Sequence, residues 1–303
     1  MTMKNSVFTL CLCSIIVACG TADTSTPNEF DWAINANVTV AVGEHLDRTH
    51  FRVITPSVTY LLDSASGGLS SMIDNEGNDW IAFKPEPWGQ YPPSAASAYR
   101  GIPNLVFRGQ FDGAGHPGHN GVISEVVGAN QVLCHTPEGP WAWTWTFEPS
   151  HVQLDVHDVS DTSAYWFLYE GPVGGKYQPQ QTYYATNESQ PAYRQFDHYK
   201  GGEEGAKRDW YYFGNDSVER TLFIVQVTTD SLVDHYSLLG NDTMGINSPD
   251  GMVVAGFGRA PGALPMLQKP NRFIIGLSEG QGTSPGMYNR KQREIEKLLH
   301  SPD

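Results

Sequence analysis

The chain has 303 residues and an acidic balance, with 33 Asp and Glu against 19 Lys and Arg and a formal net charge of −14. This balance argues against a nucleic-acid-binding protein, because binding to phosphates needs lysine and arginine. Charged residues make up only 17% of the chain while aromatic residues make up 12%, a composition typical of a thick β core or of a β-sandwich that handles sugars.

The first eighteen residues have the layout of an export signal. Lys4 precedes an uncharged apolar run from Val7 to Ala18, which is shorter than the ~20 residues that a membrane-spanning helix needs. The small residues before Cys19 resemble the lipobox of bacterial lipoproteins. This resemblance implies cleavage before Cys19, a lipid on its sulfur and, with Gly20 following, sorting to the outer membrane of the cell envelope. The alternative is an ordinary signal peptide with incidental cysteines.

Residues 19–30 are polar and predict a flexible tether behind the lipid. The rest, 31–303, is long enough to form a single large β domain with its own core. After cleavage the chain retains two cysteines, Cys19 and Cys134. A lipidated Cys19 leaves Cys134 without a disulfide partner, so we expect Cys134 to be a small buried side chain in that core.

Strand signals begin at Phe51, where β-branched and aromatic runs alternate with Gly, Asn, Asp and Pro turns. Some runs alternate with a period of two, such as Trp141, Trp143 and Trp145 against small or polar neighbours. Those tryptophans predict either buried core or a platform on which a sugar ring stacks. We expect strands at 51–55, 58–62, 69–73, 141–148, 151–157, 164–169, 210–213, 221–227, 251–257 and 272–276.

One helix is expected, at 284–300. Ser284 is a suitable N-cap, and Pro285 fits the first helical position. The apolar residues that follow form one stripe, which includes Met287, Ile295 and Leu298. Together these elements predict an all-β protein: an antiparallel two-sheet β-sandwich of the supersandwich or jelly-roll type, with one C-terminal helix.

The stretch 51–81 resembles the opening of galactose-mutarotase-like β-supersandwiches. It holds paired strands, a turn at Gly67 and Gly68, and a second turn that ends in Gly77 before Trp80. The resemblance covers a small part of the mature chain, and the remainder agrees only in the spacing of its predicted strands. It implies a fold that is found in several polysaccharide lyases, in sugar epimerases and in non-catalytic modules.

Two long stretches, 84–121 and 171–207, have no clear period and are rich in Pro, Gly and Tyr. Loops of this length within a domain are often functional, so we expect the two to meet over one face of a sheet. In the first, His116 and His119 lie between Gly and Pro on a stiff turn, where an imidazole can transfer a proton near neutral pH. The alternatives are surface turn residues, or a metal pair for which no third ligand is evident.

The remaining candidates are residues that can donate or accept protons or bind a carboxylate. In the second stretch, Tyr183 and Tyr184 are candidate acids or bases, and Arg194 can bind a carboxylate with two hydrogen bonds. Each could equally pack over a sheet or lie exposed. Further candidate substrate contacts are Arg100, Asn104, His198, Trp210 and Arg259.

The expected function is that of a polysaccharide lyase, which cleaves a uronate-containing chain by β-elimination. That reaction needs a carboxylate neutraliser, a base and an acid, and Arg, His and Tyr can supply these roles without a cofactor. Whether the protein also binds a structural or catalytic divalent metal is left open by the sequence. The expected partners are a polysaccharide or oligosaccharide and, through the lipid, a membrane, but no nucleic acid. The alternatives are a non-catalytic glycan-binding lipoprotein and a mutarotase-like sugar epimerase.

Overall fold

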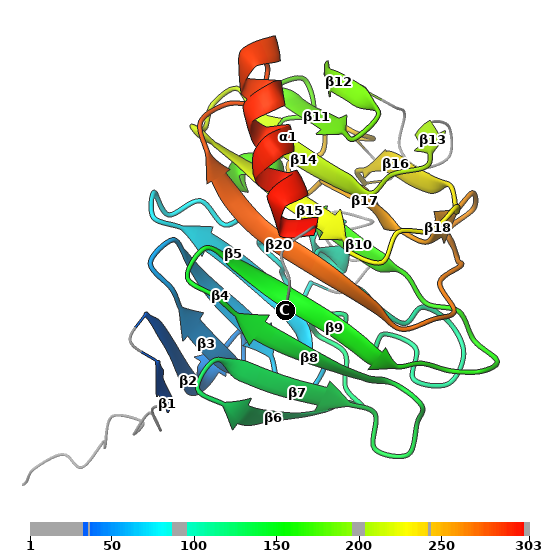
Figure 1. Ribbon diagram of the computed structural model, residues 1–303. Helices are drawn as coiled ribbons and strands as arrows, with labels where there is room; N and C mark the ends of the chain where they lie inside the picture. Colours follow the sequence, from blue (N-terminus) through cyan, green and yellow to red (C-terminus); the bar gives the residue numbers. More distant parts are fainter. Residues whose placement is uncertain (1–32, 36, 87–95, 196–203, 242–243, 300–303) are drawn as a thin grey trace, which may run out of the picture.

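The computed structural model describes residues 33–35, 37–86, 96–195, 204–241 and 244–299. The proposed signal peptide, Cys19 and the tether lie outside the described residues, and so does His198. Within the described ranges the strands pair antiparallel and form sheets of five, four, nine and two strands. The structure confirms the predicted all-β sandwich with a C-terminal helix (Figure 1).

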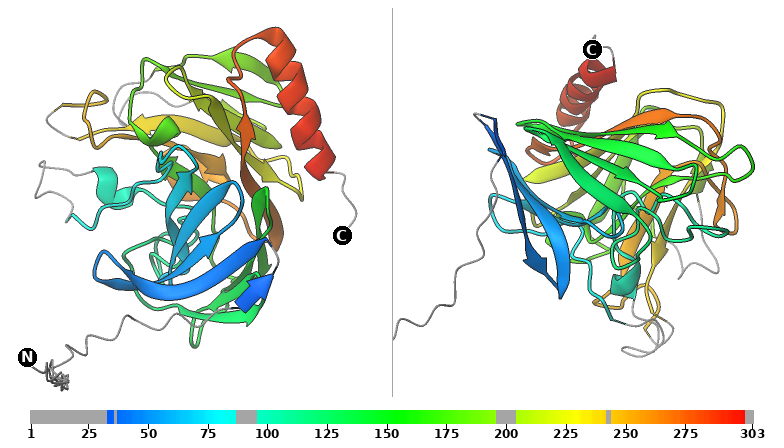
Figure 2. Two further views of the ribbon diagram at one scale, coloured as in Figure 1. Left: turned by 90° about the vertical axis from the view of Figure 1, so that its left-hand side faces the viewer. Right: turned by 90° about the horizontal axis from the view of Figure 1, so that it is seen from below.

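The nine-stranded sheet extends through both halves of the molecule (Figures 1 and 2). Its central strands have the period-two alternation or the apolar runs that predicted them. In spatial order it contains β12 (Ser189–Ala192), β11 (Thr182–Thr186), β14 (Trp210–Asn215), β15 (Arg220–Gln226), β20 (Asn271–Glu279), β9 (His151–Asp158), β8 (Ala142–Phe147), β7 (Gln131–His135) and β6 (Ile123–Gly128).

The five-stranded sheet packs against one half of this sheet, at the side of β6 to β9 (Figure 1). Trp143 and Trp145 face this interface, and both indole N–H groups donate to the carbonyl of Gly67, over 3.1 and 3.0 Å. They are therefore buried core rather than a sugar platform. The sheet contains β1 (Ala33–Asn35), β2 (Val38–His45), β3 (Arg48–Ile54), β4 (Val58–Asp63) and β5 (Gly68–Asp74).

The four-stranded sheet packs against the other half. Aromatic rings fill this second interface: Phe167 stacks on Phe273 with centroids 4.4 Å apart, and Tyr184 stacks on Tyr236 at 4.1 Å. The sheet contains β10 (Phe167–Gly171), β17 (Met252–Phe257), β16 (Asp234–Leu239) and β13 (Glu204–Ala206). Short elements complete the fold: β18 (Arg259–Ala260), β19 (Leu264–Pro265) and the 3₁₀ turns at Ala96–Tyr99 and Val173–Gly175.

Helix α1 (Pro285–Leu299) covers the outer face of the nine-stranded sheet (Figures 1 and 2). The Ser284 hydroxyl accepts from the Met287 backbone N–H at 3.3 Å, which confirms the predicted cap. Tyr288 and Ile295 pack onto strand residues of that face, among them Trp210. Across the described part of the chain, we find no helix long and apolar enough to cross a membrane.

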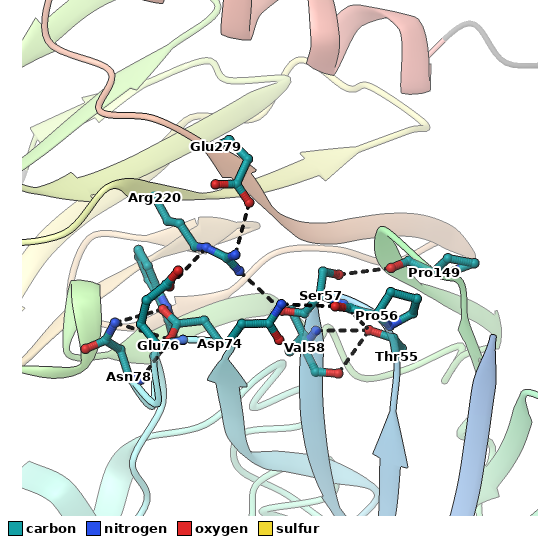
Figure 3. Close-up of polar contacts among 12 residues, drawn as sticks. Thr55, Pro56, Ser57, Val58, Asp74, Glu76, Asn78, Pro149, Arg220 and Glu279 are labelled. Carbon is teal, nitrogen blue, oxygen red and sulfur yellow. Dashed lines mark hydrogen bonds and ion pairs between the residues drawn. The ribbon is translucent and has the colours of Figure 1, made fainter.

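Arg220 on β15 joins the nine-stranded sheet to the edge of the five-stranded one (Figure 3). Its buried guanidinium forms ion pairs with Glu76 at 3.1 Å and with Glu279 at 3.0 Å. It also donates to the carbonyl of Ser57 at 3.3 Å. Ser57 and Glu76 flank strands of the five-stranded sheet, so one side chain holds three segments together.

Two expectations about the elements are wrong. Strands begin before Phe51, because β1 and β2 precede it. The stretch 171–207 is not one irregular loop, because it contains β11, β12 and β13. Tyr183 and Tyr184 thus lie on β11, where pairing with β14 outweighs the local turn residues.

Candidate functional site

A cavity of about 590 Å³ lies between the segment 98–119 and the face of the four-stranded sheet that is turned away from the nine-stranded sheet. The residues around it combine aromatic, aliphatic, polar and charged side chains. Its lining includes Tyr99, Asn104, Val106, Phe107, Asp112, His116, His119, Trp166, Leu168, Glu170, Ser237, Leu239, Val254 and Arg259.

Alternate residues at β10 form one wall of the cavity. Trp166, Leu168 and Glu170 face it, while the alternating Phe167 and Tyr169 belong to the core between the sheets. The segment 101–105 runs antiparallel beside this wall. Gly101 exchanges two backbone hydrogen bonds with Glu170, over 2.8 and 3.0 Å.

Arg100 holds the beginning of that segment in place. Its guanidinium is buried and donates to the carbonyls of Ala82, at 3.1 Å, and Gly251, at 2.9 Å. It does not line the cavity, so the structure gives Arg100 a supporting position instead of the expected substrate contact.

Asn104 is oriented by its neighbours. Its backbone has a φ of 48°, and its carbonyl accepts a hydrogen bond from the indole of Trp166. Its side-chain Nδ2 donates to the carbonyl of Tyr99 at 3.1 Å, so Oδ1 points away from that carbonyl. This Oδ1 is buried and has no hydrogen-bond partner among the described residues.

His116 and His119 lie on consecutive tight turns. The His116 N–H donates to the carbonyl of Gly113, and the His119 N–H donates to the carbonyl of His116. The two rings meet edge to face with centroids 4.9 Å apart. Both rings line the cavity, with His119 the more exposed of the two.

The His116 ring is held as a neutral acceptor. Burial, and then the neighbouring His119, lowers its pKa to about 4. Its Nδ1 lies 2.7 Å from the carbonyl of Pro117, an acceptor, so Nδ1 carries the proton. On that tautomer the buried Nε2 atom is a lone-pair acceptor, and the backbone of Tyr99 is a further hydrogen-bonding neighbour of the ring.

Glu170 is shifted in the opposite direction. Burial raises the pKa of its carboxyl to about 8, although the positive charge of Arg259 opposes the shift. Arg259 is itself buried and lines the same cavity. The Ser237 hydroxyl on β16 adds a buried polar group with no hydrogen-bond partner among described residues.

An aromatic pair forms the apolar part of the lining. Phe107 stacks on Trp166, with centroids 5.0 Å apart and planes at 17°. The guanidinium of Arg108 lies over the ring of Phe107 at 5.1 Å. The described residues contain no group of three His, Cys, Asp or Glu side chains that could hold a metal ion.

Comparison with known proteins shows the fold. No protein-family model matches the chain, and no curated protein is significantly similar in sequence. The solved structure of the protein HI1317 superposes with a TM-score of 0.52 at 10% identity, over 82% of this chain and 99% of that chain. YeaD from Salmonella typhimurium, described as a candidate mutarotase, gives 0.50 at 10% identity, over 81% and 95%. The fold is galactose-mutarotase-like.

This mutarotase-like fold was expected from residues 51–81, and the superposition extends it over most of the chain. An identity of 10% establishes the fold alone, so the chemistry must be argued from the cavity itself. Of the residues singled out in the sequence, the mutarotase-like scaffold brings four to its cavity: His116, His119, Asn104 and Arg259.

Other candidates lie elsewhere in the scaffold. The Tyr183 hydroxyl accepts from the Gly282 N–H at 2.7 Å, on the helix-covered face, and Trp210 packs on the same face. Tyr184 is in the core between the sheets, and Arg194 is exposed after β12. No described residue between 171 and 207 lines the cavity, so the described parts of the two long stretches do not meet there as expected.

The candidate acid, Glu170, and the aromatic wall of Phe107 and Trp166 were not predicted from the sequence. Glu170 follows directly after the apolar run 164–169, and an ionisable group at the end of a buried strand was the available signal. Trp166 and Phe107 carried no local signal, because their stacking depends on two segments that are distant in the chain.

Proposed function

We propose that the chain is a sugar epimerase of the mutarotase type, which binds a sugar in the cavity and interconverts its anomers by opening the ring. The observation that carries this proposal is that Glu170 and His116 line one cavity and that burial shifts their pKa values in opposite directions. Two titratable groups whose environments shift their pKa values apart are typical of an acid and base pair.

The cavity lining supports a polyhydroxylated ligand. Asn104 Oδ1, His116 Nε2 and Ser237 Oγ are buried polar atoms without hydrogen-bond partners among the described residues. Each such atom costs about 1–3 kcal/mol while it lacks a partner, and a sugar hydroxyl reaches it only when the surrounding side chains move, because none of the three is exposed to solvent. The aromatic pair of Phe107 and Trp166 offers an apolar surface for the C–H face of a ring.

The proposed reaction assigns one proton transfer to each group. At neutral pH the Glu170 carboxyl holds its proton and the His116 ring is neutral. Nε2 of His116 takes the proton of the anomeric hydroxyl, the bond between the anomeric carbon and the ring oxygen breaks, and Glu170 protonates the ring oxygen. The aldehyde carbon rotates, and the reverse transfers close the ring as the other anomer.

The structure offers less support for a lyase. β-Elimination was expected to use Tyr183 or Tyr184 with Arg194, and none of these lines the cavity that holds the histidines. Arg259 could still bind a carboxylate there, so a uronate remains a suitable test substrate.

Anomer exchange measured by NMR tests the proposal. We expect the mature protein to accelerate exchange of at least one pyranose in a panel of hexoses and uronates. Glu170→Gln should reduce the rate by about 10²–10⁴-fold, because a positioned acid is lost. Glu125→Gln, on the exposed β6, is the matched control and should behave as the wild type. Binding without faster exchange would indicate a binding module, and new ultraviolet absorbance from an unsaturated uronate would indicate a lyase.

A further inference from the structure

We infer that Arg48 and Asp63 form a clamp that positions the two cavity histidines, so that both are positioning residues for the reaction proposed above. Arg48 begins β3 and Asp63 ends β4, so both lie at the same end of the five-stranded sheet, where Asp63 is paired with His50. Neither lines the cavity. The inference rests on the proposed function for its kinetic consequence, but its structural consequence can be measured separately.

The Asp63 carboxylate is fully buried and holds four donors. Its Oδ2 accepts from Arg48 Nε and from the backbone N–H of Gly118, both at 2.8 Å. Its Oδ1 accepts from Arg48 Nη2 at 3.2 Å and from the Ala65 N–H at 3.1 Å. One carboxylate therefore connects the arginine to the backbone just before His119.

Arg48 completes the clamp on the next residue. Its Nη2 donates to the carbonyl of His119 at 2.5 Å. The Gly118 N–H and the His119 carbonyl are thus held by the two members of one ion pair. Arg48 thus binds the Asp63 carboxylate and the His119 carbonyl at the same time, an arrangement that we call the fork. It needs a guanidinium, because an ammonium group does not hold its N–H groups in fixed directions.

A second attachment lies on the other side of His116. The Gly115 N–H donates to the carbonyl of Ser66 at 2.7 Å. The two chains approach so closely there that a Cβ on Gly68 would lie 2.0 Å from the Gly115 carbonyl oxygen. The histidine turns therefore lie directly on the 63–68 turn, and the clamp fixes their far end.

The clamp matters because the acid and the base come from different sheets. Glu170 is on β10 of the four-stranded sheet, whereas the histidine turns are attached to the five-stranded sheet. The relative position of Glu170 and His116 depends on how firmly the turns are held. A displacement of about 1 Å in such a pair can cost about 10²-fold in rate.

The test compares Arg48→Met and Arg48→Lys with Arg52→Met, a matched control on the exposed face of the same strand. All are prepared with ¹³C-labelled histidine rings, and their ring spectra, kcat and KM are measured. We expect Arg48→Met to shift the His116 and His119 signals and to lower kcat by about 10²-fold, with little change in KM. Arg48→Lys should recover only part of kcat, and Arg52→Met should match the wild type.

The outcomes separate this inference from the proposed function. If the wild type shows no anomer exchange, the proposed function fails, and shifted ring signals in Arg48→Met but not in Arg52→Met still support the clamp. Unchanged ring signals and unchanged kcat in Arg48→Met would overturn it. Recovery of full kcat by Arg48→Lys would also overturn the fork geometry. Asp63→Asn is a second variant of the clamp. If Asp63→Asn fails to fold, the Arg48 variants decide the question, because the Arg48 side chain is partly exposed and its replacement disturbs the core less.

Discussion

Burial acts in opposite directions on the two titratable residues of the proposed mechanism. Removal from water disfavours the charged form of any group. It therefore raises the pKa of the Glu170 carboxyl to about 8 and lowers the pKa of the His116 ring to about 4. A single physical cause thus leaves a proton on the carboxyl and a lone pair on the imidazole at neutral pH.

A pH profile follows from these two values. Activity should fall at low pH as His116 becomes protonated near pH 4, because the base is lost. It should also fall at high pH as Glu170 ionises near pH 8, because the acid is lost. The measurement is kcat/KM for anomer exchange between about pH 3 and about pH 10, which spans both pKa values. The residual activity of Glu170→Gln should lack the alkaline limb, and an activity that rises through pH 8 would contradict the assignment.

Among the elements, β10 supplies the candidate acid of the site. Its alternate residues serve two environments, with Phe167 and Tyr169 in the core and Leu168 and Glu170 at the cavity. The sequence showed a run apolar on both faces, which correctly predicted a strand. It did not show that one face would be covered by the segment 98–119 instead of by a second sheet.

The junction between the sheets depends on Arg220 (Figure 3). We expect Arg220→Met to lower the free energy of unfolding by about 1–3 kcal/mol, because the hydrogen bond to Ser57 and the ion pairs with Glu76 and Glu279 are lost. Urea unfolding measures the change. The control is Arg290→Met, which removes an exposed pair with Glu294 within α1 and should have a much smaller effect. Equal effects of the two variants would show that Arg220 does not join the sheets.

For the whole molecule, the cavity lies where segments attached to the five-stranded and four-stranded sheets meet. The polar atoms of the site belong to segments near 104, 116, 170 and 237, so no contiguous sequence motif predicts the site. The clamp and the Arg220 junction are likewise matters of tertiary structure, since both connect residues distant in sequence.

The export and lipidation of the chain stay predictions from its first nineteen residues. We propose that the wild type is anchored in the cell envelope through Cys19 and that Cys19→Ser is unanchored or unprocessed. Cell fractionation with palmitate labelling measures this. A control substitution in the tether, Thr21→Ser, should leave anchoring unchanged. A soluble, unlabelled wild type would exclude the lipoprotein assignment and leave the ordinary signal peptide.

The sequence alone determined the fold class, most of the central strands, the capped helix and the irregular segment with its two histidines. These features depend on period, turn chemistry and capping, which act over a few neighbouring residues. The tertiary structure decided which candidates share a cavity: it placed Glu170 with His116 and separated Tyr183, Tyr184 and Arg194 from them. The physical reason is that strand pairing and burial join distant segments, and the pKa values of the acid and the base depend on that burial.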